Sequence, residues 1–145
     1  MRPSGTGKAL IVSNGYPPVD WAGTETYTAN VANELARRGW EVRVVCGGRW
    51  SRGNAYWNGV VEDRSGDVSV HRLCLNWAEA PDPNGVLVDS PLVGRYVERL
   101  LAEFPADVVH VTSCYNLSVR PILAAKESGR PPVTSPIFAC SAALK

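Results

Sequence analysis

The sequence predicts an α/β fold in which helices cover both faces of a mostly parallel sheet. Three observations support this prediction. Short runs rich in β-branched residues alternate with longer segments whose apolar residues recur every three or four positions. Glycines and prolines separate these segments. The chain has 145 residues, which suits one domain with a substantial core.

The chain is organised around residues 8–38, which predict a strand, a turn-rich loop and an amphipathic helix. The apolar run 9–12 is too short for a helix and is followed by the turn formers Ser13-Asn14-Gly15. The helix opens at Gly23 and Thr24 and ends at Gly39. Its apolar residues recur at helical spacing: Tyr27, Val31, Ala32, Leu35 and Ala36.

Gly23 stands where the helix exposes unpaired backbone N–H groups. Together with the helix dipole, these groups favour an anion, so we expect a phosphate near Gly23. The alternative is that Gly23 only forms a tight turn. Glu25 lies in the first turn, where its side chain can cap the helix. A catalytic role for Glu25 is the other interpretation.

The next elements extend this unit. A strand at 42–45 completes a β-α-β unit, whose right-handed connection places the helix N-terminus at the carboxyl edge of the sheet. Residues 47–67 are rich in glycine and are expected to form an ordered loop. In that loop Trp50 and Trp57 either form a binding lid or pin the loop to the domain.

The middle of the chain predicts a strand, a loop and a long helix. Residues 68–73 alternate between apolar and polar, as in an edge strand with one wetter face, which would leave His71 at the surface. Prolines make 76–85 a loop. Pro91 begins a helix with a strong apolar stripe.

The last elements are a strand at 108–111, a turn at 112–116, a helix at 118–128 and a short strand at 133–135. The predicted order is therefore strand-helix-strand-strand-helix-strand-helix-strand. Three segments fall at carboxyl ends of strands: residues 14–24, residues 112–116 and the segment after Ser135. A ligand cleft is expected across them.

His110 lies near the end of its strand, and its near-neutral pKa suits a general base or a ligand-binding group. A hydrogen-bonded structural histidine is the alternative. The chain has no Ser-His-Asp spacing and no cluster of metal ligands, so we assign neither catalytic residues nor a metal site. A dinucleotide site is not favoured, because the first loop lacks G-x-G-x-x-G.

Composition bounds the partners and the compartment. The net charge of +1, with interspersed signs, predicts no nucleic-acid partner. The four cysteines form no CxxC pair and are expected to be reduced thiols. The N-terminus has too few apolar residues for a signal-peptide core, so we expect a cytoplasmic protein.

Four segments carry a family resemblance. Tyr16-Pro17-Pro18, Ala22-Gly23-Thr24-Glu25 and the segment LARRGWEV at 35–42 resemble the opening of the retaining glycosyltransferases of family 4. Residues 107–111, DVVHV, resemble a later strand of that family. The resemblance runs from Lys8 to about Ser135. It implies that residues 1–145 are one Rossmann-like domain, the acceptor-side N-terminal half of a GT-B fold, with the C-terminal donor-binding domain absent from this chain.

The resemblance also implies a function. The chain would take part in transfer of a sugar from a nucleotide-sugar donor to an acceptor, with no cofactor beyond that co-substrate, and would be inactive alone. A partner chain could supply the donor domain. In the family, the turn corresponding to Gly23 approaches the donor diphosphate. The residues expected to bind substrate are Gly23, Thr24, Glu25, His110 and Asn116.

The sequence departs from the family at three places. Ala22 replaces the first glycine of the motif, Thr112 replaces a second histidine, and Pro136-Ile137-Phe138 lacks the histidine usual near the reacting sugar. The alternative function is therefore a non-catalytic binding or partner domain. An unrelated nucleotide-binding protein would instead bind NAD or FMN. Surface exposure of Tyr16, Trp21 and Phe138 would favour self-association.

Overall fold

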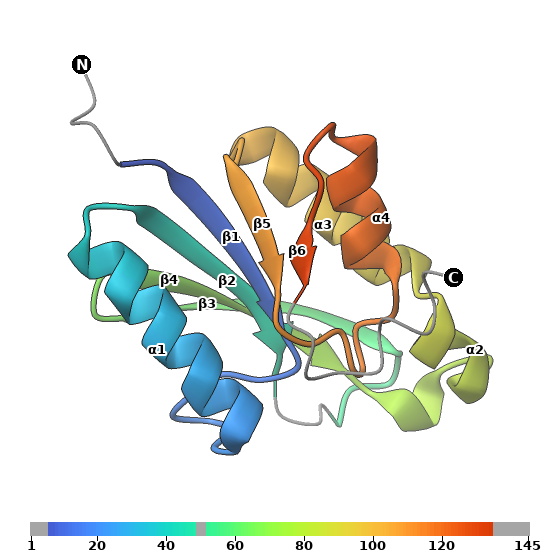
Figure 1. The fold of residues 1–145 in the computed structure, drawn as a ribbon. Helices are drawn as coiled ribbons and strands as arrows, with labels where there is room; N and C mark the ends of the chain where they lie inside the picture. Colours follow the sequence, from blue (N-terminus) through green and yellow to red (C-terminus); the bar gives the residue numbers. More distant parts are fainter. Residues whose placement is uncertain (1–5, 49–51, 135–145) are drawn as a thin grey trace.

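The computed structural model describes residues 6–48 and 52–134, in which a six-stranded sheet lies between helices (Figure 1). The sheet order is β3-β4-β2-β1-β5-β6. All neighbouring strands are parallel except the antiparallel pair β3–β4. The strands are β1 (Lys8–Ser13), β2 (Glu41–Gly47), β3 (Trp57–Ser65), β4 (Val68–Leu75), β5 (Val108–Val111) and β6 (Val133–Thr134). The predicted Rossmann-like α/β fold is confirmed.

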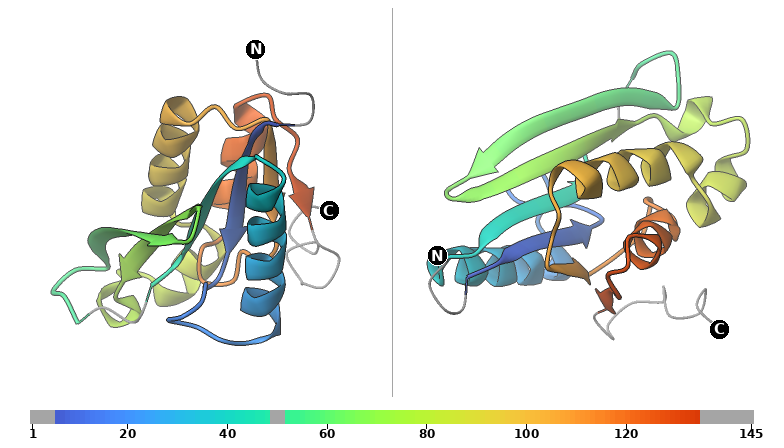
Figure 2. Two further views of the ribbon diagram at one scale, coloured as in Figure 1. Left: turned by 90° about the vertical axis from the view of Figure 1, so that its left-hand side faces the viewer. Right: turned by 90° about the horizontal axis from the view of Figure 1, so that it is seen from above.

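The helices divide between the two faces of the sheet (Figure 2). Helix α1 (Gly23–Arg37) covers one face, and α3 (Pro91–Glu103) and α4 (Arg120–Glu127) cover the other. A 3₁₀ turn, η1 (Trp77–Glu79), and the short helix α2 (Pro83–Val88) follow β4. The expectation of a loop over 76–85 is therefore wrong for η1 and for the first half of α2. Their first turns are capped locally, by Asn76 Oδ1 accepting from Ala78 N and by Asp82 Oδ1 accepting from Gly85 N.

Strand β1 lies in the interior of the sheet, and its side chains are buried from Ala9 onward. Leu10 and Val12 pack toward α3 and α4, whereas Ile11 packs toward α1. This two-sided burial explains why β1 is a continuous apolar run. Each of these side chains contributes roughly 1.5–3 kcal/mol of burial free energy.

Residues 57–65 form the edge strand β3, so the expectation of a loop over 47–67 is wrong there. Residues 61–64 of β3 are exposed. Three of them form the charged run Glu62-Asp63-Arg64, so the sequence shows no apolar alternation that would indicate a strand. Gly66, with φ of 60°, makes the tight turn that pairs β3 with β4. The ring of Trp57 lies 5.9 Å from that of Tyr96, which favours pinning over a lid for Trp57. Trp50 lies outside the described residues.

Strand β4 lies between β2 and β3, so the prediction of an edge strand is wrong. His71 is only 3% exposed, which also corrects its expected surface position. Its Nδ1 lies 2.8 Å from the Tyr96 hydroxyl of α3. His71 is thus enclosed by β3 and α3, which the local pattern could not show.

The buried face of α1 differs from the expected stripe. Thr28 and Ala32 are fully buried, whereas Tyr27 is exposed. Val31, Leu35 and Ala36 pack against the sheet while remaining partly exposed. Helix α1 is therefore rotated so that Thr28 faces polar groups at the ends of the strands. Helix α4 begins two residues later than expected, and Ser135, the expected end of the last strand, lies outside the described residues.

Candidate functional site at the carboxyl edge of the sheet

A cleft of about 420 Å³ lies at the carboxyl edge of the sheet. Parallel strands end at the same edge, so the loops that follow them meet there. The cleft wall includes Asn14 after β1, Gly48 after β2, and Tyr115 and Asn116 after β5. Trp77 of η1, with Pro83, Asn84 and Leu87 of α2, adds to it, as do Gly47, Leu73 and Leu75. Two of the three segments expected to meet are thus together; the segment after Ser135 lies outside the described residues.

The glycines that end β2 are explained by the close approach of backbone. Gly47 N donates to Asn14 O at 3.2 Å, and a Cβ on Gly47 would lie 2.8 Å from that oxygen. Gly48 N donates to Leu73 O at 2.7 Å. Glycine therefore lets the loops after β1 and β2 form the floor of the cleft.

Glu25 is buried and connects α1 to the cleft. Its Oε1 accepts a hydrogen bond from Asn14 Nδ2 at 2.8 Å. The N-cap residue Ala22 makes no side-chain cap, and the bond of Glu25 goes to Asn14. The capping interpretation is therefore not what the structure shows. Within the described residues, Asn14 Oδ1 and Glu25 Oε2 are buried without a hydrogen-bond partner, which leaves two acceptors beside the cleft.

Gly23 is exposed at the start of α1, and the fold does not require a glycine there. Its φ lies outside the left-handed region, and a Cβ would meet no atom of residues 6–48 or 52–134 within 4 Å. The interpretation of Gly23 as a tight-turn residue therefore has no support. The missing side chain leaves the uncapped start of α1 open to an approaching group. Neither Gly23 nor its partly buried neighbour Thr24 belongs to the described cleft wall.

His110 lies on β5, beside Ile11 of β1 and Val133 of β6. It is partly buried, and its ring meets that of Tyr27 edge-on, with centroids 6.3 Å apart. Burial lowers the pKa of His110 and so favours the neutral imidazole. His110 thus faces α1, whereas Asn116 lines the cleft.

Thr112, which replaces the family histidine, belongs to a buried hydroxyl network. Its Oγ1 lies 2.7 Å from Thr28 Oγ1 and donates to Val12 O at 3.1 Å. Thr28 also donates to Ser13 Oγ at 3.3 Å. The network joins α1 to the ends of β1 and β5, and it explains why the polar residue Thr28 is buried.

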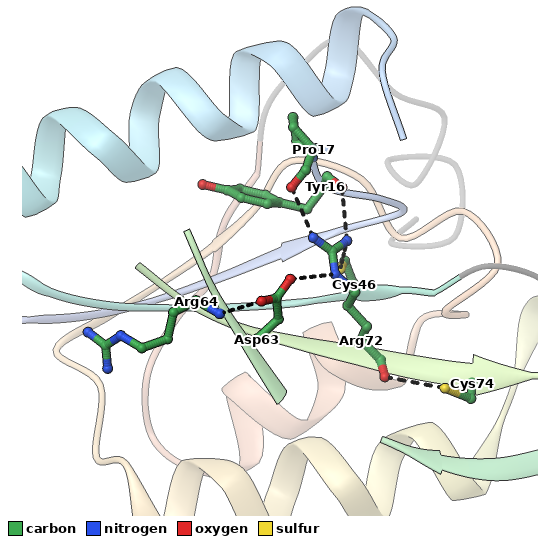
Figure 3. A network of polar contacts seen from close by, with 7 residues as sticks. All are labelled: Tyr16, Pro17, Cys46, Asp63, Arg64, Arg72 and Cys74. Carbon is green, nitrogen blue, oxygen red and sulfur yellow. Dashed lines mark hydrogen bonds and ion pairs between the residues drawn. The ribbon is translucent and has the colours of Figure 1, made fainter. Parts of the chain in front are cut away.

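Arg72 holds the loop between β1 and α1, a role that the sequence did not reveal (Figure 3). The side chain is buried on β4, with Nη1 donating to Tyr16 O and Nη2 to Pro17 O, each at 2.9 Å. Its Nε lies 3.6 Å from Asp63 Oδ2 on β3. The peptide bond Pro17–Pro18 in this loop is cis. Arg72 thereby fixes the loop that begins at the cleft and ends at Gly23.

Other side chains near the edge differ from expectation. Tyr16 is 1% exposed, so its expected exposure is wrong, whereas Trp21 is 71% exposed and Phe138 lies outside the described residues. Cys46 and Cys74 are free thiols, and burial raises the pKa of Cys46 to about 12. Cys114 is disulfide-bonded, which corrects the expectation of reduced thiols throughout. In the described ranges, no three His, Cys, Asp or Glu residues gather to hold a metal ion.

Comparison with known families decides the affiliation. The family model for the glycosyl transferase 4-like domain matches residues 22–142. This chain belongs to the glycosyl transferase 4-like domain family. The predicted resemblance to the N-terminal domain of a family 4 glycosyltransferase is thus confirmed. A search of curated protein sequences found no significant match.

Solved structures share the fold of this glycosyl transferase 4-like domain. Sucrose-phosphate synthase from Thermosynechococcus elongatus aligns with a TM-score of 0.54 at 15% identity, over 83% of this chain and 29% of that one. A trehalose-phosphate synthase from Burkholderia vietnamiensis gives a TM-score of 0.55 at 16% identity, over 89% and 32%. The trehalose-phosphate synthase from Burkholderia xenovorans, solved in complex with glucose-6-phosphate, gives a TM-score of 0.53 at 16% identity, over 88% of this chain and 32% of that one. The chain therefore spans about a third of the length of these enzymes. Among its described helices, none is long and apolar enough to cross a membrane.

Proposed function

We propose that this chain is the acceptor-side half of a glycosyltransferase that moves a sugar from a nucleotide-sugar donor to an acceptor. The observation that carries the proposal is the cleft at the carboxyl edge of the sheet, in a chain of the glycosyl transferase 4-like family. Folds of this kind bind their ligands at that edge. The acceptor would occupy the cleft beside Asn14 and Asn116.

The donor diphosphate would approach the start of α1 at Gly23 and Thr24. An uncapped helix N-terminus offers backbone N–H groups and a favourable dipole to an anion. The open space around the Gly23 Cα supports this role, since no contact in the described part of the chain requires a glycine there. Glu25 would hold Asn14 in place, and His110 would support α1 through Tyr27.

The rest of the donor site would come from a second domain, in the same polypeptide or in a partner chain. The solved relatives are about three times the length that this chain covers, which is consistent with such a half. The 145-residue chain alone would therefore be inactive. The exposed rings of Trp21 and Tyr115 would be covered by this domain or by a second copy of the chain. We also propose a cytoplasmic location, to be tested by fractionation of the native cells.

The experiment that tests this function compares two substitutions on α1. The native assembly is captured through a tag on this chain, and release of nucleoside diphosphate from a panel of nucleotide sugars is measured. Gly23→Trp should lower turnover about 100-fold by displacing the donor, while the thermal midpoint stays unchanged because the site is open. Asn30→Trp places the same ring on an exposed position of α1 and should keep full turnover. Full turnover in Gly23→Trp would contradict the proposal.

A non-catalytic partner domain is the second candidate. The observation that favours it is Thr112, which stands where the family has a histidine and is bound into a structural network. In that case the captured assembly would release no nucleoside diphosphate, and Gly23→Trp would leave partner binding intact. Co-purification of the same partner with wild type and variant, without turnover in either, would establish this alternative.

A further inference from the structure

We infer that the cleft takes an uncharged polyhydroxyl acceptor, a neutral saccharide or polyol, and discriminates against sugar phosphates. This inference rests on the function proposed above and names the substrate class of the same site. It follows from the charge of the cleft wall, from the hydrogen bonds already made there, and from the side chains that remain to bind a ligand.

The described wall of the cleft contains no Lys, Arg, His, Asp or Glu residue. A phosphate ester carries up to two negative charges, and its removal from water must be offset by cations or several N–H donors. Arg72 holds the loop beside the cleft, but both of its terminal nitrogens donate to backbone carbonyls. The Glu25 carboxylate behind Asn14 adds negative potential. The electrostatics of this wall therefore oppose a phosphate.

The glycine-rich end of β2 is also unavailable as a phosphate cradle. Gly47 N and Gly48 N point their hydrogens at Asn14 O and Leu73 O, at 3.2 and 2.7 Å. A phosphate cradle needs backbone N–H groups that are free to face the ligand. These two glycines serve the packing of the loops, and neither of their N–H groups is free to form an anion nest.

The side chains that remain match a sugar. Asn84 and Asn116 bring two amides to the wall, and each amide can donate to and accept from hydroxyl groups. The third amide, that of Asn14, is already bonded to Glu25 through Nδ2. The rings of Trp77 and Tyr115 supply apolar faces for the C–H side of a pyranose. Trp77 is fixed by Tyr56, whose ring meets it at 5.2 Å. A volume of about 420 Å³ lies within the range of small-molecule sites, roughly 300–1,000 Å³.

Asn116 has the geometry of a residue that sets specificity. Its φ of 64° lies in the left-handed region, where Asn and Asp are tolerated better than other side chains. Asn116→Asp therefore keeps both shape and backbone while it replaces an amide donor with a negative charge. Asn84 is exposed on α2 and allows the opposite change of charge. Asn84→Lys adds a cation to the wall.

The test titrates the isotope-labelled 145-residue chain with neutral mono- and disaccharides and, in matched pairs, with their phosphate esters, including glucose and glucose 6-phosphate. Amide shifts of Gly47, Gly48 and Asn116 report occupation of the cleft. At least one neutral sugar should bind at these amides, at least 10-fold more tightly than its phosphate. Asn116→Asp should weaken it about 10-fold, and Asn30→Asp, on the exposed side of α1, should leave it unchanged. Asn84→Lys should strengthen binding of the phosphate ester and so reduce the preference for the neutral sugar.

The outcomes separate this inference from the proposed function. Tighter binding of the phosphate ester at the same amides would overturn the inference. The proposed glycosyltransferase function would still stand if turnover of the captured assembly were sensitive to Gly23→Trp. Binding of neither class at these amides would overturn the inference and the placement of the acceptor in the cleft. Equal weakening by Asn116→Asp and Asn30→Asp would show that the sugar binds elsewhere, which also overturns the inference.

Discussion

Replacing Arg72 by methionine should destabilise the domain more than any exposed charge could. The side chain is buried, and its two terminal nitrogens are the donors for the carbonyls of Tyr16 and Pro17, at 2.9 Å. Both of these residues are themselves buried. Tyr16 O also accepts from Asp20 N at 3.3 Å, whereas Pro17 O would lose its Arg72 donor. Leaving a buried carbonyl without a donor costs about 1–3 kcal/mol, so Arg72→Met should lower the free energy of unfolding by at least that amount.

Urea denaturation followed by circular dichroism measures this cost, and hydrogen exchange shows where it acts. The urea midpoint of Arg72→Met should be lower than that of the wild type, with little change in the urea slope. Relative to the wild type, amide exchange should speed up more in residues 14–22 than in α3. The matched control is Arg37→Met, which removes an exposed ion pair with Glu34 and should cost less than about 1 kcal/mol. Equal costs for Arg72→Met and Arg37→Met would refute the anchoring role of Arg72.

Three further predictions concern groups that the fold buries or constrains. Burial lowers the pKa of His71, so its contribution to stability is complete above the unfolded value of about 6.5 and is lost as pH falls below it, by at most about 1.4 kcal/mol per pH unit. Between pH 7.5 and 5, the free energy of unfolding should fall less steeply with pH in His71→Gln than in the wild type. An equal pH dependence in the two proteins would count against this. Gly129→Ala, at φ of 79°, should cost about 1–2 kcal/mol in thermal unfolding, whereas Gly23→Ala should be nearly neutral; similar losses would be contrary to the geometry. Thr112→Val removes the hydroxyl bonded to Thr28 and Val12 O and should cost about 1–3 kcal/mol, and an unaltered melting temperature would argue against the network.

The elements that the sequence predicted best are those buried along their whole length. Strand β1 is a continuous apolar run because both of its faces are covered, and α3 shows its stripe because one face packs on the sheet. In such elements the local pattern records the burial. Strand β3 is different, because it is held by pairing with β4, and none of its own side chains is fully buried. No periodic pattern was present to reveal it.

Polar residues of β4 were misplaced for a related reason. His71 and Arg72 look like a wet face in the sequence, but their partners lie 25 and 56 residues away, on α3 and in the loop after β1. Such contacts are invisible to a local pattern. In the site, the positions of Asn14 and Asn116 could be predicted from strand topology alone. Asn14 directly follows β1, and Asn116 lies in the turn after β5. Trp77 does not, because the path of the segment between β4 and α3 depends on local caps.

The most direct test of the central claim is native mass spectrometry of the particle captured from the source cells through a tag on this chain, with nucleotide sugars added. An acceptor-side half predicts a particle well above the 15.7 kDa of this chain, one that binds a nucleotide sugar and releases the nucleoside diphosphate when acceptor is present. A particle of 15.7 kDa that turned over the donor by itself would contradict the division of the site between two domains.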